Sequence, residues 1–444
     1  MRILHTSDWH LGHTFHGLDR GREHAAFLAW LLELIVEREV DALLVTGDVF
    51  DSACPPVSAE RAWLDFLAEA RVASPGLDVV VIGGNHDSAQ RLDAPGALLR
   101  ALGVHVVGGL ARREDRSLDL ERLLVPLHDA AGEVAAWVAA VPFLRPADLP
   151  RGTRGASASA RLEEGVRAVY DEVLAAARER RQPGQALLGT GHCTLRGSRL
   201  SAGSERTIYG GDALPVDLFP AELAYVAMGH LHHAQAVAGR DEVRYAGSPL
   251  PLSFAEAGYE HEVRLVQLAG EELVAQEGIA IPRAVDLIRL PAEGPAPLAE
   301  VLELIAALPE CKADEALEER PYLEVRVQVE GPAPGLRRHV EEALDHKRPR
   351  LVKLEVRRSA KAESLPERHA GTHLGDLDPR DVFQRCYARQ HEDEQAPAEL
   401  LSAFEELLSE VRGEQDATRE SGVAAARAAT LDVEALTVSE AEAS

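Results

Sequence analysis

Carboxylate, imidazole and amide side chains follow five apolar segments of this chain, each where the segment ends. The motifs are DWH at 8–10, GDVFD at 47–51, GNHD at 84–87, GH at 191–192 and GHLH at 229–232. Mixed oxygen and imidazole ligands without thiolate favour a borderline-hard divalent ion, with Mn²⁺ the first choice and Fe²⁺ or Zn²⁺ as alternatives. The predicted ligands are Asp8, His10, Asp48, Asn85, His192, His230 and His232.

Asp48 is the residue best placed to bridge two ions. It follows the apolar run DALLVT at 41–46 and Gly47, which lets the backbone turn sharply at a strand end. Seven ligands with one shared aspartate correspond to a two-metal centre, which activates a hydroxide and stabilises charge on a phosphoryl group. Each motif alone has an ordinary alternative, because Asp48 could cap the next segment, and a lone DxH or histidine is more often a turn or a structural residue.

The segments between the motifs alternate between strand and helix patterns. We predict strands at 1–5, 41–46 and 79–84, with helices at 20–38 and 57–72 between them. Asp8 and His10 are two residues apart, so on an extended segment they would share one face. Open α/β sheets place ligands at the carboxyl ends of their strands, where these motifs fall. Further predicted elements are a helix at 160–181 and strands at 105–108, 133–143, 185–192, 224–229, 243–248 and 262–268.

Composition limits the class of protein. A chain of 444 residues with 46% hydrophobic and 27% charged residues indicates a globular protein of two or more domains. No run of 18 or more apolar residues and no signal-peptide core appears, and the four cysteines are far apart, so we expect a cytoplasmic protein without a membrane partner. The net charge of −26 opposes nucleic-acid binding, but residues 391–444 hold 14 acidic and 3 basic side chains, whereas 346–361 hold seven basic and one acidic.

Taken in order, DxH, GDxxD, GNHD, GH and GHxH resemble the motifs of the calcineurin-like metallophosphoesterases. HTSDWHLG at 5–12, GDVFDSACPP at 47–56, VPFLRP at 141–146 and YAGSPLPLSF at 245–254 resemble one branch, the double-strand-break-repair nucleases that include the bacterial SbcD proteins. The resemblance covers residues 1–270 strongly and the remainder loosely. It implies an α/β fold, a metallophosphoesterase β-sandwich of two mixed sheets flanked by helices.

The resemblance also implies roles for single residues. His86 would lie over the phosphate and stabilise the transition state or protonate the leaving oxygen. Asp51 would orient His86, although some family members have a histidine at this position, and a turn or helix cap is the alternative. One metal would be held by Asp8, His10, Asp48 and His232, and the other by Asp48, Asn85, His192 and His230.

Beyond residue 282 the pattern predicts a small α+β domain at 282–365, after a nuclease domain at 1–275. In the family a comparable domain caps the nuclease and guides DNA, so 346–361 is a candidate for phosphate contacts, with a solvated sheet edge as the alternative. Two amphipathic helices are predicted within 376–412. In the family such helices bind an SbcC-type ABC ATPase; the alternative is that they pack on the cap. We expect the acidic tail at 413–444 to be disordered.

The resulting hypothesis is a nuclease with two divalent metal ions, most readily Mn²⁺, that hydrolyses double-stranded DNA ends and hairpins in recombination, replication and repair. The resemblance implies that this chain forms a homodimer, that the homodimer assembles with the ATPase, and that the complex is associated with the nucleoid. A stand-alone phosphodiesterase or phosphatase for small molecules or phosphoproteins is the alternative, but it would need neither cap nor helices. A non-catalytic scaffold with a decayed site is a third hypothesis, which the complete ligand set opposes.

Overall fold

The computed structural model describes residues 1–150, 157–200, 208, 213–312 and 315–358, with short stretches between 380 and 404. The chain divides into two units, residues 1–359 and 360–444, which we describe separately. Among the described residues, no helix combines the length and the apolar character needed to cross a membrane. The tail predicted at 413–444 and most of the segment predicted at 376–412 lie outside the described residues.

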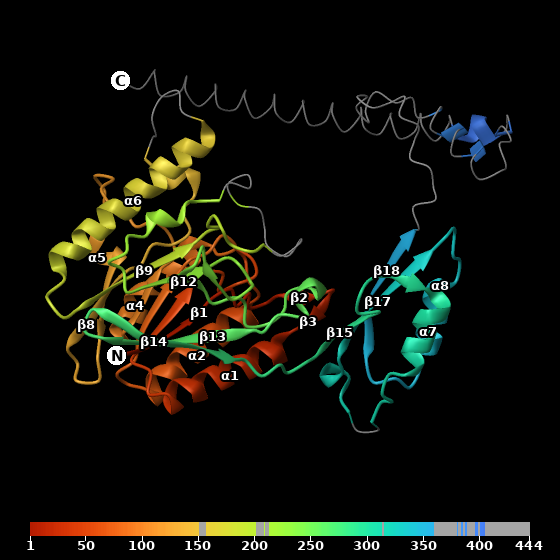
Figure 1. Cartoon of the computed structure of the whole chain (residues 1–444), viewed down its shortest axis with the longest axis horizontal. Helices are drawn as coiled ribbons and strands as arrows, with labels where there is room; N and C mark the ends of the chain where they lie inside the picture. Colours follow the sequence, from red (N-terminus) through yellow and green to blue (C-terminus); the bar gives the residue numbers. More distant parts are fainter. Residues whose placement is uncertain are drawn as a thin grey trace, which may run out of the picture. The chain divides into compact units, whose positions relative to one another are not determined.

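Two six-stranded sheets form the framework of residues 1–280 (Figure 1). The first sheet has the order β14-β13-β1-β4-β5-β6. Strands β1, β4, β5 and β6 are parallel to one another, whereas β13 pairs antiparallel with both of its neighbours, β1 and β14. The mixed sheet predicted from the sequence is therefore confirmed here. Its strands are β1 (Arg2–Thr6), β4 (Ala42–Thr46), β5 (Asp78–Ile82), β6 (Val104–Val107), β13 (Glu262–Ala269) and β14 (Glu272–Ala280).

The second sheet has the order β11-β12-β10-β9-β8-β7, with a parallel centre and an antiparallel strand at each edge. Both sheets are thus mixed, as expected. The edge strands β7, β11 and β14 are absent from the sequence prediction, and β14 runs past the expected domain boundary at 275. The strands of the second sheet are β7 (Leu124–His128), β8 (Val134–Ala139), β9 (Ala186–His192), β10 (Tyr225–Gly229), β11 (Gln235–Val237) and β12 (Arg240–Tyr245).

Apolar side chains on both faces of each central strand explain why runs such as ALLVT contain no polar residue before the final threonine. One face of the first sheet packs on the second sheet, with Leu44 and Leu188 in the shared core. Its other face packs on α1 (Gly21–Glu37) and α2 (Val57–Ala73) through residues such as Leu43. The helix α6 (Ala158–Arg180) packs against β8 in the second sheet. Further short helices are α3 (Ala89–Asp93), α4 (Gly96–Ala101) and α5 (Leu120–Leu123).

Residues 287–358 form a small α+β unit in the region predicted as the cap, and we call it the cap. Its central strand β17 (Tyr322–Val329) pairs in parallel with β15 (Leu287–Leu290), β16 (Ala296–Pro297) and β18 (Arg350–Arg358). Two helices, α7 (Leu298–Ala306) and α8 (Leu336–Ala343), cover one face of this sheet, and Val325 and Val340 lie in the core between them.

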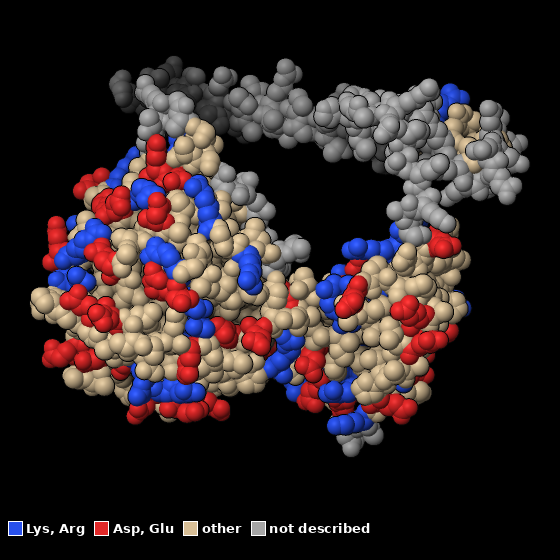
Figure 2. All heavy atoms as spheres, viewed as in Figure 1, with Lys and Arg blue, Asp and Glu red and all other residues tan. Residues whose placement is uncertain are grey.

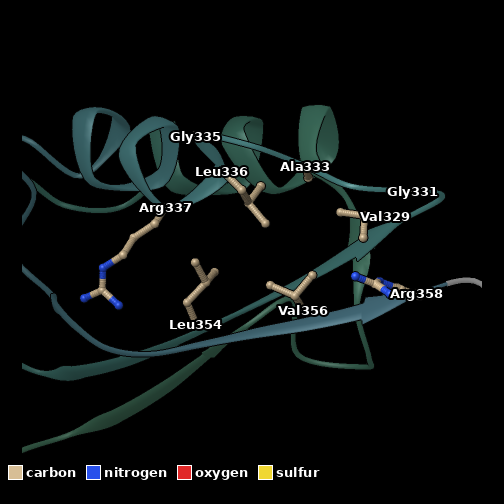
Figure 3. Close-up of a pocket in the computed structure, with 9 residues that line it drawn as sticks. All are labelled: Val329, Gly331, Ala333, Gly335, Leu336, Arg337, Leu354, Val356 and Arg358. Carbon is tan, nitrogen blue, oxygen red and sulfur yellow. The ribbon is translucent and has the colours of Figure 1, made fainter. Parts of the chain in front are cut away.

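A pocket of about 330 Å³ lies in the cap, between the start of α8 and the ends of β17 and β18 (Figure 3). Leu336, Leu354 and Val356 point into it, and Arg337 and Arg358 stand at its margin. None of its lining residues is a carboxylate or a histidine. The pocket therefore offers no set of metal ligands.

Buried neutral histidines predict that the fold weakens in mild acid. Burial lowers the pKa of both His5 and His24 to about 3, against 6.5 for an ordinary histidine. Between about pH 3 and pH 6.5 the unfolded chain binds more protons than the folded chain. The contribution of these histidines to the free energy of unfolding is therefore complete above about pH 6.5 and is lost as the pH falls toward about 3. The loss is at most about 1.4 kcal/mol per group and pH unit. In EDTA, we expect the Tm to fall from pH 7 to pH 5, and His24→Asn to reduce that fall. An unchanged slope in the variant would exclude His24 as a contributor.

Candidate metal centre

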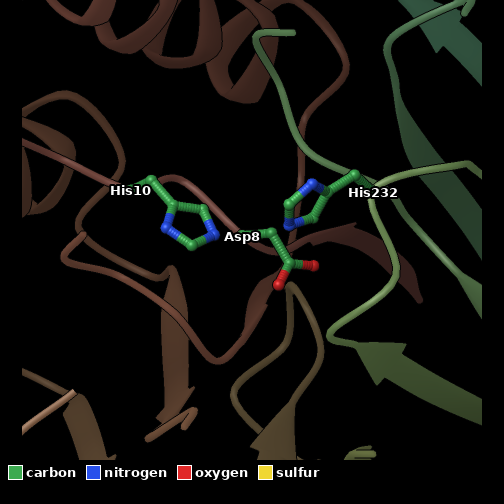
Figure 4. Close-up of side chains that lie close together, drawn as sticks. All are labelled: Asp8, His10 and His232. Atoms are coloured by element: carbon green, nitrogen blue, oxygen red, sulfur yellow. The ribbon is translucent and has the colours of Figure 1, made fainter. Parts of the chain in front are cut away.

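The seven predicted ligands meet at the carboxyl ends of β1, β4, β5, β9 and β10, which bring together strands from both sheets. The ligand atoms of Asp8, His10 and His232 lie within 4.8 Å of one another, and Figure 4 shows the three side chains converging. The same limit holds for a second group, which consists of Asp48, His192 and His230. Asn85 Oδ1 lies between the two histidines of this second group, 3.0 Å from His192 Nε2 and 2.9 Å from His230 Nδ1.

Left-handed backbone angles aim several of these side chains. Asp8, His10 and Asp48 have φ values of 53°, 47° and 48°, and His230 has 98°. The expectation that Asp8 and His10 share one face of an extended segment is therefore wrong, because a tight loop makes them converge. Positive φ costs a non-glycine residue free energy, and such residues gather at functional sites.

Glycines at the strand ends leave room for the ligands. A Cβ atom on Gly47 would overlap the imidazole of His192, and one on Gly84 would overlap the carboxylate of Asp48. Gly47 also has a φ of 95°, which an L side chain rarely adopts. The glycine that precedes Asp48 is thus required both by the backbone turn and by the packing of a ligand from the other sheet.

Two of the histidines are oriented by hydrogen-bond acceptors outside the centre, and a third contacts a carboxylate there. His192 Nδ1 lies 2.9 Å from Thr46 O and His232 Nδ1 lies 3.0 Å from Glu256 Oε1, whereas His10 Nδ1 lies 3.3 Å from Asp51 Oδ1 without forming a hydrogen bond. An Nδ1–H donated outward fixes the tautomer and leaves the Nε2 lone pair directed inward, which is the usual arrangement of metal-binding histidines.

The donor atoms at the centre fit a bound cation. In the neutral form that a metal ligand requires, with its proton on Nδ1, His192 would present an Nε2 lone pair to Asn85 Oδ1 at 3.0 Å and to Asp48 Oδ2 at 3.3 Å. Oxygen and nitrogen lone pairs at these distances repel one another unless a positive charge lies among them. Both ring nitrogens of His10 are also buried without a hydrogen-bond partner. Imidazole, carboxylate and amide donors suit a divalent ion of the Mn²⁺, Fe²⁺ or Zn²⁺ type.

Electrostatics also favour positive charge at this position. Burial alone would raise the pKa of Asp48, but His192 and the other nearby imidazoles hold it below its ordinary value. Conversely, Asp48 outweighs the effect of burial on His192 and raises its pKa to about 9. Because a metal ligand must be neutral imidazole, metal binding here would displace a proton from His192.

His86 differs from the predicted arrangement in what orients it. Its main-chain N–H donates to Asp48 Oδ1 at 2.8 Å, and its ring Nδ1 donates to the main-chain carbonyl of Asp51 at 2.7 Å. The Asp51 carboxylate lies instead on His10. The prediction that the Asp51 side chain orients His86 is therefore wrong, since that side chain supports a candidate metal ligand.

Asp87 and Glu256 support the centre from outside. Asp87 accepts main-chain N–H groups from Gly84, Phe50 and Val49 at 2.9, 3.0 and 3.2 Å, so it ties the GNHD turn to the GDVFD motif. Burial and the charge of Asp48 raise the pKa of Asp87 to about 6. Glu256 is absent from the sequence prediction, because it lies 24 residues from its partner His232 and belongs to no metal-ligand motif.

Groups of carboxylate and imidazole side chains that could hold divalent ions, at the strand ends of a two-sheet α/β fold, fit a metal-dependent phosphoesterase. The family model of the calcineurin-like phosphoesterases matches residues 1–234. A second model, described as the type 5 capsule protein repressor C-terminal domain, matches residues 283–391.

Similar proteins identify the branch. The SbcD protein of the SbcCD nuclease from Rhodobacter capsulatus is 45% identical over 375 residues, which are 81% of this chain and 88% of the relative. The SbcD protein of Escherichia coli K12 is 32% identical over 94% of this chain and 100% of its own length. That of Bacillus subtilis 168 is 34% identical over 62% of this chain and 69% of its own length. The chain belongs to the SbcD family of metal-dependent nucleases.

Proposed function

We propose that this chain hydrolyses phosphodiester bonds at double-stranded DNA ends and hairpins, with two Mn²⁺ ions, as the nuclease component of a complex with an SbcC-type ATPase. The observation that carries the proposal is the meeting of all seven ligands, Asn85 among them, in two adjacent groups. A decayed site would have lost at least one of them, so the scaffold hypothesis is not favoured. The names of the relatives support a nuclease over a phosphatase.

In this proposal Asp8, His10 and His232 hold one ion, and Asn85, His192 and His230 hold the other, with Asp48 shared. Ions bound by these residues would supply an activated hydroxide and would offset the charge that develops on the phosphoryl oxygens. Asp48 is suited to sharing because its Oδ2 lies 3.3 Å from His192 Nε2 and 3.8 Å from His10 Nε2.

His86 is the residue proposed to act on the substrate. It is half-buried, and its ring centroid lies 4.8 Å from that of His10. The carbonyl of Asp51 holds the Nδ1–H, so the ring is fixed before a substrate arrives. From this position a protonated His86 would stabilise the phosphoryl charge or donate its Nε2 proton to the leaving oxygen.

The basic segment of the cap is largely engaged within the molecule. Lys347 Nζ donates to two carbonyls at the end of α7, at 2.7 and 3.0 Å, and Arg348 pairs with Glu315 at 2.7 Å. Lys353 and Arg357 pair with glutamates at 2.6 and 2.7 Å. Figure 2 shows acidic and basic side chains intermixed on the face that it presents. The partner of Lys353, Glu324, is fully buried, so that pair is costly to separate. Arg357 is exposed and its pair with Glu355 is worth at most about 1 kcal/mol, so we propose that DNA phosphates compete for Arg357.

The direct test is degradation of end-labelled linear duplex DNA by the purified chain, in Mn²⁺, in Mg²⁺ and in EDTA, beside a chromogenic phosphodiester. We expect cutting in Mn²⁺ and none in EDTA. Hydrolysis of the chromogenic ester alone calls for addition of the ATPase and ATP, and continued failure on DNA would then support the small-substrate enzyme. No hydrolysis of either substrate would revive the scaffold hypothesis.

The expected homodimer has a candidate surface on α2 and α4. Val57, Leu64 and Val72 stand on α2 at intervals of about two helical turns, with exposed fractions of 71%, 43% and 83%. Leu98 on α4 is 69% exposed. The ion pair between Glu60 and Arg91, at 3.0 Å, joins α2 to the neighbouring α3. A stripe of large apolar side chains on α2, with a further exposed leucine on α4, is suited to the same surface on a second copy.

We expect Leu64→Glu combined with Leu98→Glu to convert the dimer into a monomer, because two carboxylates per chain would have to be buried in the interface. Light scattering after size exclusion should then report the monomer mass of 48.0 kDa instead of about twice that value. Leu317→Glu, at a 54% exposed site in the cap, is the matched control and should leave the dimer intact. A double variant that remains dimeric would exclude this surface.

The ATPase is the other proposed partner. Of the two amphipathic helices predicted within 376–412, the structure describes only a few residues, and these belong to the second unit. Within that unit the rings of Phe383 and Phe404 stack at a centroid distance of 4.2 Å. These two side chains, one from each predicted helix, thus cover one another. We propose that the remaining apolar positions of the segment contact the ATPase.

A further inference from the structure

Glu256 lies directly behind one of the candidate metal ligands. Its Oε1 accepts from His232 Nδ1 at 3.0 Å and its Oε2 accepts the main-chain N–H of Leu252 at 2.8 Å. The residue is fully buried, with an exposed fraction of 0%. A carboxylate held at both oxygens cannot rotate, so it fixes the tautomer and the ring orientation of His232.

The segment that carries Glu256 is seated against the cap. Glu256 ends the short 3₁₀ helix η4 (Phe254–Glu256), and the ring of Phe254 packs on that of Phe15 with a centroid distance of 5.0 Å. The same apolar cluster contains Leu287 and Tyr322, which are the first residues of the cap strands β15 and β17. A movement of these strands would therefore shift the helix that carries Glu256.

A buried network of hydrogen bonds and an ion pair also connects the cap to the segment that carries Glu256. Tyr322 Oη donates to Glu23 Oε1 at 2.8 Å, and Glu23 forms a two-pronged pair with Arg20 at 2.8 and 2.6 Å. Arg20 then donates to the carbonyl of Pro251, five residues before Glu256, at 2.5 Å. Arg20 and Glu23 are 1% and 3% exposed. Buried charges of this kind are costly to separate, so this network resists movement of Tyr322 relative to Pro251.

From these contacts we infer that Glu256 is a positioning residue for His232, and that the cap, through Tyr322, holds Glu256 in place. The inference rests on the proposed metal centre, whose Asp8–His10–His232 group it concerns. The cap would then do more than contact DNA, since its seating would set the affinity of one of the two metal positions. Both oxygens of Glu256 are engaged away from the Asp48–His192–His230 group, which should therefore be independent of it.

Two substitutions of different severity test the two halves of the inference. Glu256→Gln keeps the shape of the side chain but weakens its acceptor, and a change in this outer shell typically lowers metal affinity about 10–100-fold. Tyr322→Phe removes only one hydroxyl, so the fold is preserved and a smaller loss at the same position is expected. Asp78→Asn is the matched control. Asp78 Oδ2 lies 3.0 Å from His128 Nδ1, the same separation as in the Glu256–His232 pair, but at the opposite end of β5 from Asn85.

The measurement is titration of the full-length chain with Mn²⁺, followed by calorimetry and by the electron paramagnetic resonance of free and bound Mn²⁺. We expect two ions in the wild type and in Asp78→Asn. Glu256→Gln should weaken one site about 10–100-fold and leave the other unchanged, and Tyr322→Phe should weaken the same site less.

Each contrary result has a distinct meaning. Wild-type uptake of both ions by Glu256→Gln would overturn the positioning role. A weakened Glu256→Gln beside an unaffected Tyr322→Phe would overturn the contribution of the cap. Equal weakening in Asp78→Asn would show a general loss of stability instead of a positioning effect, and would also overturn the inference. A wild-type chain that takes up no Mn²⁺ would remove the proposed metal centre itself.

Discussion

The His86→Asn variant is expected to keep two metal ions and to lose phosphodiester hydrolysis by roughly 10²–10⁴-fold, the usual contribution of general acid–base catalysis. Asparagine can place its amide N–H where His86 Nδ1 donates to the Asp51 carbonyl, 2.7 Å away, so the local turn is preserved. It has no group at the position of Nε2, the atom proposed to act on the phosphate. The variant therefore separates catalysis from folding and metal binding.

Turnover of the chromogenic ester and of duplex DNA, with Mn²⁺ uptake measured on the same preparation, checks this prediction. His233→Asn is a suitable control, because His233 lies beside the proposed ligand His232 in the sequence without a predicted role. Loss of the metal ions from His86→Asn would instead make His86 a ligand. The structure makes that alternative concrete, since His86 also groups with His10 and Asp48.

Asp48→Asn is expected to have the largest effect on metal binding. Asp48 is the only residue of the described chain shared by the two proposed ion positions, and asparagine replaces one of its two oxygens by an amide nitrogen that cannot bind a cation. We expect a loss of affinity beyond the roughly 10–100-fold typical of an outer-shell change, at both positions, and no measurable hydrolysis.

Thermal unfolding with and without Mn²⁺ measures this loss without relying on activity. At about 100 times its Kd, a ligand stabilises the folded state by about 2.7 kcal/mol, so the wild type should gain several degrees in Tm. Asp48→Asn should gain none, whereas His86→Asn should gain as much as the wild type. An Asp48→Asn chain that Mn²⁺ still stabilises fully would rule out a shared aspartate.

The sequence allowed the central strands and the grouping of the seven candidate ligands to be predicted, because both depend on local sequence patterns. Strands such as Ala42–Thr46 are buried on both faces and read as short apolar runs, and each is followed directly by its ligand motif. The edge strands β11 and β14 were missed for the opposite reason. β14 is mostly exposed and β11 has three residues, so neither carries a clear pattern.

Other features of the site depend on contacts that no local pattern contains. The loop that turns Asp8 and His10 inward is held by bonds to the next motif, from Asp8 N to Gly47 O and from His10 N to Asp48 O, each 3.0 Å long. The choice of His10 as the partner of Asp51 follows from the same packing. Glu256 could not be predicted either, since its pairing with His232 requires the fold to return to the first motif.

The position of β1 also has a consequence for synthesis on the ribosome. β1 lies between β4 and β13, and Arg2 is paired with Gln267. The first strand to be synthesised therefore cannot complete its pairing until β13, one of the last strands of its sheet, has been made. At about 5–20 residues per second, that interval is roughly 15–50 s. During this time one edge of an apolar parallel sheet stands unpaired, which is the kind of surface that chaperones bind and that aggregates when translation is slow.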